Sequence, residues 1–180
     1  MTDFLTRLAV RENILAKWNQ LSVDEAIAQI QPCCGSKVWA QQLVMRRPFE
    51  DELALTAAAD QIWRGLPGED WMEAFLSHPR IGESRAARTL SQRSTNWSTQ
   101  EQRNVSVADG AVKAVLARAN REYERRFGHI FIVCASGRSA TEIVEILQRR
   151  MQNDPETEVQ EAAEQQRQIT QIRLKKWLQG

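Results

Sequence analysis

The sequence FLSHPRIGESR, at positions 75–85, contains His78, one of only two histidines in a chain of 180 residues. Pro79 follows directly and biases His78 towards an extended backbone, so a helix over the preceding apolar residues should end here. A histidine just beyond a helix end, beside a polar loop, is placed to line a cleft and to exchange protons near neutral pH. The alternative is structural: His78 caps the helix or bonds a carbonyl group.

A second group of candidates lies in the sequence STQEQ, Ser98 to Gln102. The spacing of Ser98 and Glu101 is that of a capping box, which predicts a helix that begins at Ser98. The N–H groups of such a first turn can hold an anion or a carbonyl oxygen, so Ser98, Glu101 and Gln102 could together bind a polar ligand. Glu101 also has a purely structural interpretation, in which it only completes the cap.

Arg173 is the third candidate because of the helix face on which it lies. Gln166, Ile169, Arg173 and Trp177 follow helical spacing along one largely apolar stripe. A buried, unpaired guanidinium is costly, so Arg173 needs a partner. That partner is either a carboxylate elsewhere in the fold or water, or an anionic or carbonyl-rich ligand bound by the guanidinium. The other histidine, His129, opens the apolar sequence HIFIVCA and is interpreted as structural.

Other kinds of site find no support in the sequence. There is no P-loop, dinucleotide fingerprint or nucleophile elbow. With two distant histidines and no Cys-x-x-Cys motif, we expect no metal site, and Cys33 and Cys34 are predicted to be a small buried apolar pair. A net charge of +1, from 24 basic and 23 acidic residues, argues against nucleic-acid binding by bulk charge and against attraction to anionic membranes.

Cysteine usage and hydropathy indicate the compartment. The three cysteines are an odd number with two adjacent, which is not a disulfide framework. No apolar run approaches the roughly 20 residues of a membrane span, and the N-terminal residues lack the apolar centre of a signal peptide. We therefore expect a cytoplasmic protein.

Helix signals dominate the elements that would position these residues. Capping boxes are predicted at Ser22 and at Ser139, Ser36 is a further N-cap, and Gly65 and Gly128 are predicted C-caps. Helical patterns cover residues 22–30, 36–45, 49–65, 69–76, 98–127 with Gly110 as a weak point, 139–151 and 155–178. Residues 80–97 are polar and read as a loop or a loosely helical excursion. HIFIVCA is strand-like but has no pairing partner. The sequence thus predicts one all-α domain over residues 1–180, with an extended segment buried within it.

Several stretches together resemble a known family. CCGSKVW and MRRPF, SHPRIG, STQEQ, REYERRFGHIFIVCASGRS, and RRMQNDPETEVQEAAEQQRQITQIRL occur in this order across nearly the whole chain. They are similar to the 2-oxo-4-hydroxy-4-carboxy-5-ureidoimidazoline (OHCU) decarboxylases, which complete the conversion of urate to (S)-allantoin. The chain departs from the family in having Ile130 where many members have proline.

The resemblance implies an all-helical, commonly homodimeric enzyme that uses no metal and no organic cofactor and acts on a small ureide. It implies catalytic roles for His78 and Glu101. The substrate-binding residues it implies are Pro79, Ser98, Thr99, Gln100, Glu101, Gln102, Phe131, Ile132, Val133, Cys134, Ala135 and Arg173.

Two alternatives remain at this point. One is a non-catalytic helical binding module, for example a small DNA-associated domain. The other is a lyase or hydrolase that acts on another ureide with the same pocket.

Overall fold

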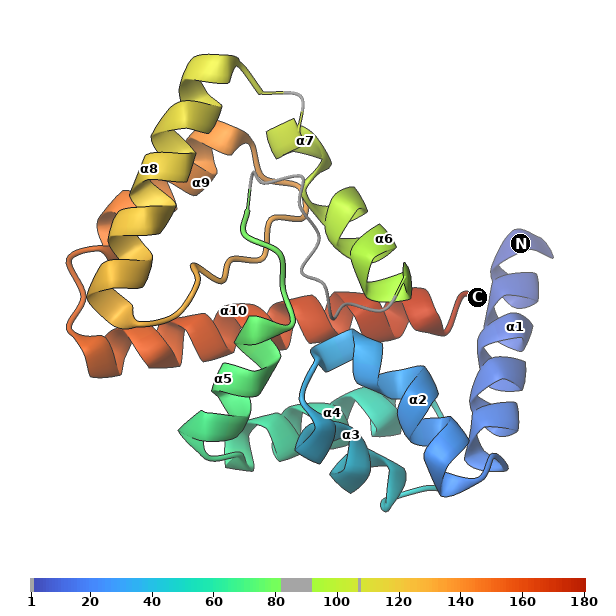
Figure 1. Cartoon of the computed structure of the whole chain (residues 1–180). Coiled ribbons are helices and arrows are strands. Elements are labelled where there is room, and N and C mark those ends of the chain that lie inside the picture. Colours follow the sequence, from blue (N-terminus) through green and yellow to red (C-terminus); the bar gives the residue numbers. More distant parts are fainter. Residues whose placement is uncertain (1, 82–91, 107) are drawn as a thin grey trace. The chain divides into compact units, whose positions relative to one another are not determined.

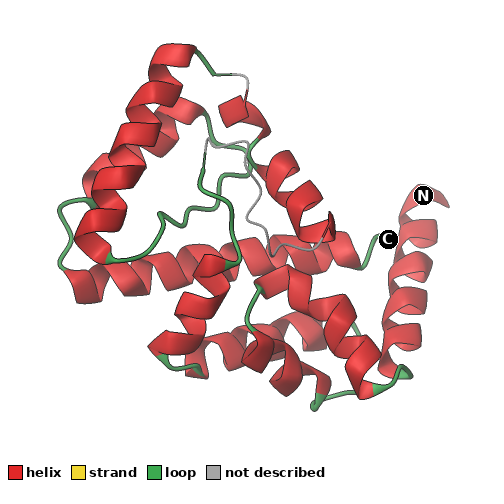
Figure 2. Ribbon diagram, in the orientation of Figure 1, coloured by secondary structure: helices red, strands yellow, loops and turns green. Residues whose placement is uncertain are grey.

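The computed structural model describes residues 2–81, 92–106 and 108–180, most of which are helical (Figures 1 and 2). Within these ranges the chain forms ten helices and no β-strand, which confirms the predicted all-α class. Contacts along the chain divide it into two compact units, Met1–Asp70 with Arg167–Gly180, and Trp71–Gln166.

The first unit is built on buried tryptophans. Its helices are α1 (Thr2–Asn19), α2 (Val23–Cys34), α3 (Lys37–Val44), α4 (Glu52–Gly65) and the second half of α10 (Pro155–Trp177). The indole N–H of Trp18 donates to the carbonyl of Ala26 at 3.0 Å, and that of Trp39 donates to the carbonyl of Ala59 at 3.1 Å. Each buried indole thus satisfies its polar atom while joining two helices.

The second unit contains most of α5 (Gly68–Leu76), α6 (Gln92–Glu101), α7 (Arg103–Ser106), α8 (Gly110–Phe127), α9 (Ala140–Arg150) and the first half of α10. Helix α8 packs along α9 (Figure 1). Between them the chain turns at Gly128, whose φ of 76° is the left-handed cap that a glycine adopts without strain. Residues 129–135 then run as an irregular loop without strand pairing (Figure 2), and Phe131 to Ala135 are buried, as the sequence predicts.

Most predicted caps are confirmed. Ser22 with Glu25 and Ser139 with Glu142 form complete capping boxes, and Ser36 accepts from the N–H of Trp39. The last helix begins at Pro155 as expected.

Two predicted helix ends are wrong. Ser98 does not begin a helix but lies inside α6, and the neighbouring Thr99 donates back to the carbonyl of Thr95 at 3.0 Å, as hydroxyls within helices do. The ligand-binding first turn expected at Ser98 is therefore not there. Gly65 is the last residue of α4 rather than its C-cap; the cap is Leu66, which is extended because Pro67 follows it.

The long helix predicted over residues 98–127 is three helices, and the last of them begins at Gly110, where a weak point was expected. Of the loop or helical excursion predicted over residues 80–97, residues 82–91 lie outside the described part of the chain. Residues 92–97 belong to α6. None of the helices in the described ranges is both long and apolar enough to cross a membrane.

Candidate functional site

His78 lies in the turn that follows α5. Its backbone N–H donates to the carbonyl of Phe75 at 3.1 Å. The carbonyl of Ala74 accepts from the Ser77 hydroxyl at 2.7 Å and from the Ser77 backbone N–H at 3.1 Å, so these bonds close the helix end. The side chain is half-buried, with the Nε2 atom shielded from solvent, and Pro79 is half-buried beside it. The turn thus holds the His78 imidazole in a position that is only partly accessible to water.

The end of α6 presents two different faces. Ser98 is buried and Glu101 and Gln102 are partly buried, whereas Thr99 and Gln100 are exposed. Residues three and four apart share a helix face, so Ser98 and Glu101 point the same way, and the N–H of Gln102 donates to the carbonyl of Ser98 at 3.0 Å. Of the five residues expected here, these three belong to the buried side.

The extended segment is held by side chains from α9, from α10 and from the turn before α9. The guanidinium of Arg150 donates from Nη1 to the carbonyl of Ile132 at 2.7 Å. The N–H of Cys134 donates to Oε1 of Gln165 at 3.0 Å, and its carbonyl accepts from Nε of Arg138 at 3.0 Å. The carbonyl of Ala135 also accepts from the backbone N–H of Arg138 at 3.1 Å. The segment is therefore anchored through its backbone at Ile132, Cys134 and Ala135.

The anchor itself is a buried ion pair. Arg150 and Glu158 have side chains that are 1% and 0% exposed, and Arg150 donates to Oε1 of Glu158 from Nε at 2.8 Å and from Nη2 at 2.5 Å. The Tyr123 hydroxyl donates to the same oxygen, and Asn153 donates to Oε2 at 2.8 Å. The guanidinium also lies over the ring of Phe131, 4.8 Å from its centre. Burial and the neighbouring carboxylate raise the pKa of Tyr123 well above its ordinary range, so the phenol stays a neutral donor.

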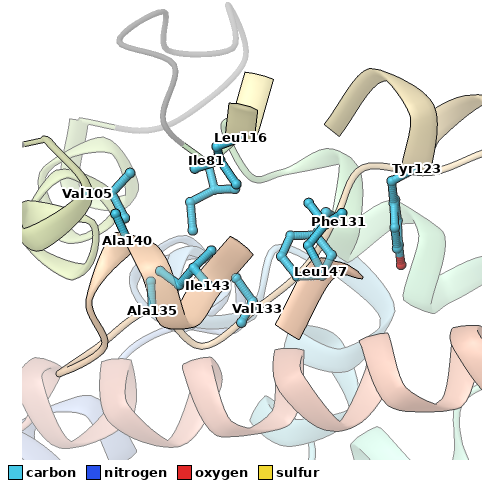
Figure 3. Close-up of a cluster of buried hydrophobic side chains, with 10 residues drawn as sticks. All are labelled: Ile81, Val105, Leu116, Tyr123, Phe131, Val133, Ala135, Ala140, Ile143 and Leu147. Atoms are coloured by element: carbon cyan, nitrogen blue, oxygen red, sulfur yellow. The ribbon is translucent and has the colours of Figure 1, made fainter. Parts of the chain in front are cut away.

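One hydrophobic core contains residues that lie near the candidate residues in the sequence (Figure 3). Ile81 comes three residues after His78 and Val105 four residues after Glu101, and both pack into the cluster that contains Phe131, Val133 and Ala135. The remaining members come from α8 and α9: Leu116, Tyr123, Ala140, Ile143 and Leu147.

A polar link joins the same elements. Nδ2 of Asn104, in α7, donates to the carbonyl of Arg138 at 3.1 Å, and Arg138 bonds the extended segment through Cys134. Ile81, helix α7 and the segment 131–135 therefore contribute to one core of the second unit.

Arg173 belongs to the first unit, in the second half of α10. It is fully buried, as its place on the apolar stripe predicts, and its Nη1 donates to the carbonyl of Pro32 at 3.4 Å. The adjacent Cys33 and Cys34 are also fully buried, which confirms the expected apolar pair. A backbone carbonyl is thus one partner of this guanidinium.

His129 has the structural surroundings that the sequence predicts. It is buried among the rings of Phe75, Tyr123 and Phe127, with centroids 5.3, 5.5 and 6.4 Å away. Its Nδ1 lies 2.9 Å from the carbonyl oxygen of Ile130, and because a carbonyl only accepts, Nδ1 carries the proton. Burial lowers the pKa of His129 below its ordinary value.

The sequence analysis missed the residues that hold the segment: Arg150, Glu158, Tyr123 and Gln165. A signal existed, because Glu158 and Gln165 are seven apart and so lie on one face of α10, where a buried acid requires a cation. Which arginine supplies this cation depends on how α9 packs against α10 in the tertiary structure, and the sequence alone does not specify that packing. In the described ranges no three histidine, cysteine or acidic residues are grouped so as to hold a metal ion.

Comparison with known proteins shows the family of the chain. The model of the OHCU decarboxylase family matches residues 19–175, and the chain belongs to this family. It is 34% identical over 152 residues to the uric acid degradation bifunctional protein TTL of Arabidopsis thaliana. The aligned region covers 80% of this chain and 44% of that protein. It is 29% identical over 151 residues to the 2-oxo-4-hydroxy-4-carboxy-5-ureidoimidazoline decarboxylase of Amia calva, covering 82% and 81% respectively. The chain thus spans less than half the length of the plant relative.

Solved structures agree on the fold. A crystal structure of an OHCU decarboxylase in the presence of (S)-allantoin superposes with a TM-score of 0.72 at 30% identity, covering 83% of this chain and 96% of that one. The fold is shared with a crystal structure of (S)-allantoin synthase, at 19% identity and a TM-score of 0.68. The superposed region covers 91% of this chain and 53% of the synthase chain.

Breaking the buried ion pair should be far more costly than breaking an exposed one. We expect Arg150→Met to lower the free energy of unfolding by about 3–5 kcal/mol, because it strands the Glu158 carboxylate and releases the Ile132 carbonyl. Urea unfolding followed by circular dichroism measures this. The matched control is Arg118→Met, whose partner Glu122 lies 4.0 Å away on the surface, with an expected change of about 0–1 kcal/mol. Equal changes in the two variants would contradict a structural role for the pair.

The titration of His129 should appear in the pH dependence of stability. Its pKa is lowered in the folded chain, so on acidification through the ordinary histidine range, near ~6.5, the unfolded chain takes up the proton first and unfolding is favoured. Stability should therefore fall between pH 7.5 and 5.5. In His129→Phe, which keeps an aromatic ring but cannot titrate, we expect a smaller fall, measured as the difference between urea midpoints at the two pH values. The same fall in both proteins would show that His129 titrates normally.

Proposed function

We propose that the chain decarboxylates 2-oxo-4-hydroxy-4-carboxy-5-ureidoimidazoline to (S)-allantoin, the last step of urate oxidation. The observation that carries the proposal is the match to the family over residues 19–175. The core shared by Ile81, Val105 and the extended segment supports it, because the first two follow His78 and Glu101 closely in the sequence. Two relatives, from Amia calva and Xenopus laevis, are named as OHCU decarboxylases.

The reaction suits a site made only of side chains and backbone. Loss of carbon dioxide leaves an electron pair on carbon, and most decarboxylases use a cofactor to accept it. In this substrate the imidazoline ring carries its own imine and carbonyl, so the electron pair has a place within the molecule. The protein then has to hold the carboxylate out of the ring plane, stabilise charge that develops on the ring, and deliver a proton to one face of the ureido-bearing carbon.

The described geometry supports a division of these tasks. The imidazole of His78 contacts the departing carboxylate and supplies or relays the proton. Glu101 and Gln102, on the buried side of α6, bind the ureido or hydroxyl groups, with Ser98 beneath them, while Pro79 packs against the ligand.

Backbone groups of Phe131 to Ala135 bind the polar groups of the ring, in a segment that Arg150 holds at Ile132. Arg173 neutralises negative charge on the substrate. Thr99 and Gln100 are exposed and contribute least.

The wider biological setting follows from the same proposal. We expect a single domain, a homodimer and a cytoplasmic location, with no metal or organic cofactor and neither nucleic acid nor membrane as a partner. The family match runs through both compact units, which supports one domain, and the burial of Cys33, Cys34 and Cys134 suits a reducing compartment.

Substitution of His78 tests the function directly. The substrate is generated freshly from urate by the two preceding activities, and the appearance of (S)-allantoin is followed by circular dichroism. We expect wild-type protein to accelerate the reaction and His78→Ala to lose about 10²–10⁴-fold in kcat, because the positioned proton donor is gone. Residual product should be racemic, since protonation in solution takes either face.

His78→Gln and the urea midpoint of both variants control for folding. A wild-type protein that does not accelerate the reaction contradicts the proposed function, and so does a folded His78→Ala that yields (S)-allantoin at the normal rate.

A further inference from the structure

Helix α8 holds the residues that follow His78 at two points. Nδ2 of Asn120, a residue only 2% exposed, donates to the carbonyl of Ile81 at 3.0 Å. One turn further along the helix, the carboxylate of Glu124 accepts from Arg80 through both oxygens, at 2.5 Å from Nε and 2.9 Å from Nη2. Residues four apart share a helix face, so both contacts come from the same side of α8.

These contacts restrain the backbone that follows His78. On its N-terminal side, His78 is bonded to the carbonyl of Phe75. On its C-terminal side, the ring of Pro79 fixes one backbone angle and restricts the one before it. Arg80 and Ile81 are then held by α8. The backbone that carries His78 therefore takes its position from the end of α5 and from α8.

Glu124 has a second connection, through its backbone. Its carbonyl accepts from the N–H of Gly128 at 2.9 Å, and this bond ends α8 directly before His129 and the extended segment. One residue thus fixes both the loop that carries His78 and the start of the segment that is proposed to bind the ligand.

We propose that Glu124 is a positioning residue for His78: through its two-point contact with Arg80, it sets the place of the imidazole relative to the extended segment. The inference rests on the proposed decarboxylation. No contact of Glu124 with the substrate is needed, since its effect passes through Arg80 and Pro79.

The solvent exposure of the ion pair between Arg80 and Glu124 indicates that its role is in positioning His78 rather than in stabilising the fold. The side chains of Arg80 and Glu124 are 46% and 24% exposed, and ion pairs this accessible contribute little to folding. A two-point contact between a guanidinium and a carboxylate nevertheless fixes direction as well as distance. Loss of the pair should therefore change catalysis much more than stability.

The experiment compares Glu124→Gln with Glu122→Gln, a matched change on the same helix at the surface pair with Arg118. We expect Glu124→Gln to lower kcat about 10-fold or more, because small displacements of a reacting group are costly in rate, with KM changed less than about 2-fold. Its urea midpoint should equal that of the wild type, and Glu122→Gln should have wild-type kcat. The exchanged variant Arg80→Glu/Glu124→Arg, which can remake the pair, should recover part of kcat.

The outcomes distinguish failure of the positioning role from failure of the proposed function. Wild-type kcat in Glu124→Gln overturns the positioning role and leaves the proposed function intact. A loss of kcat that is matched by a lower urea midpoint, or that the exchanged variant does not recover, also overturns it. Failure of the wild-type protein itself to accelerate the reaction removes the proposed function and the positioning role together.

Discussion

The ion pair between Arg150 and Glu158 is the interaction on which the second unit depends. Two charges with almost no solvent exposure are stable only when each is fully paired, and here the carboxylate accepts four hydrogen bonds, two of them from Arg150 and the others from Tyr123 and Asn153. Nη1 of the guanidinium donates to the backbone carbonyl of Ile132. Because the extended segment pairs with no strand, this buried cation replaces part of the ladder that a sheet would have supplied.

The same anchoring supports the proposed role of the extended segment as a ligand surface in an all-helical protein. Bonds at Ile132 and Cys134 hold its backbone in place. The apolar side chains of Phe131, Val133 and Ala135 meanwhile pack into the core that also receives the loop after His78 (Figure 3). Rigid support of this kind is what a reaction without an organic cofactor requires, since its rate depends on orientation and fixed dipoles.

Local signals in the sequence were sufficient for much of the fold. The capping boxes at Ser22 and Ser139 and the glycine cap at Gly128 depend on neighbouring residues only, and the structure confirms them. The box at Ser98 failed because the same Ser-x-x-Glu pattern also fits the last turn of a helix that began six residues earlier. The contacts of Arg150 with Glu158 and of α8 with the loop after His78 join distant positions, which a single sequence does not specify.

Membership of the OHCU decarboxylase family and the anchored segment lead to one central claim: the segment 131–135 and His78 hold a single ureide between them. A crystal structure of this chain grown with (S)-allantoin tests it most directly. The account predicts allantoin within hydrogen-bond distance of backbone groups of Phe131 to Ala135 and of the His78 imidazole, with the Arg150 bond to Ile132 retained. Allantoin bound elsewhere, with this segment and His78 untouched by the ligand, would contradict it.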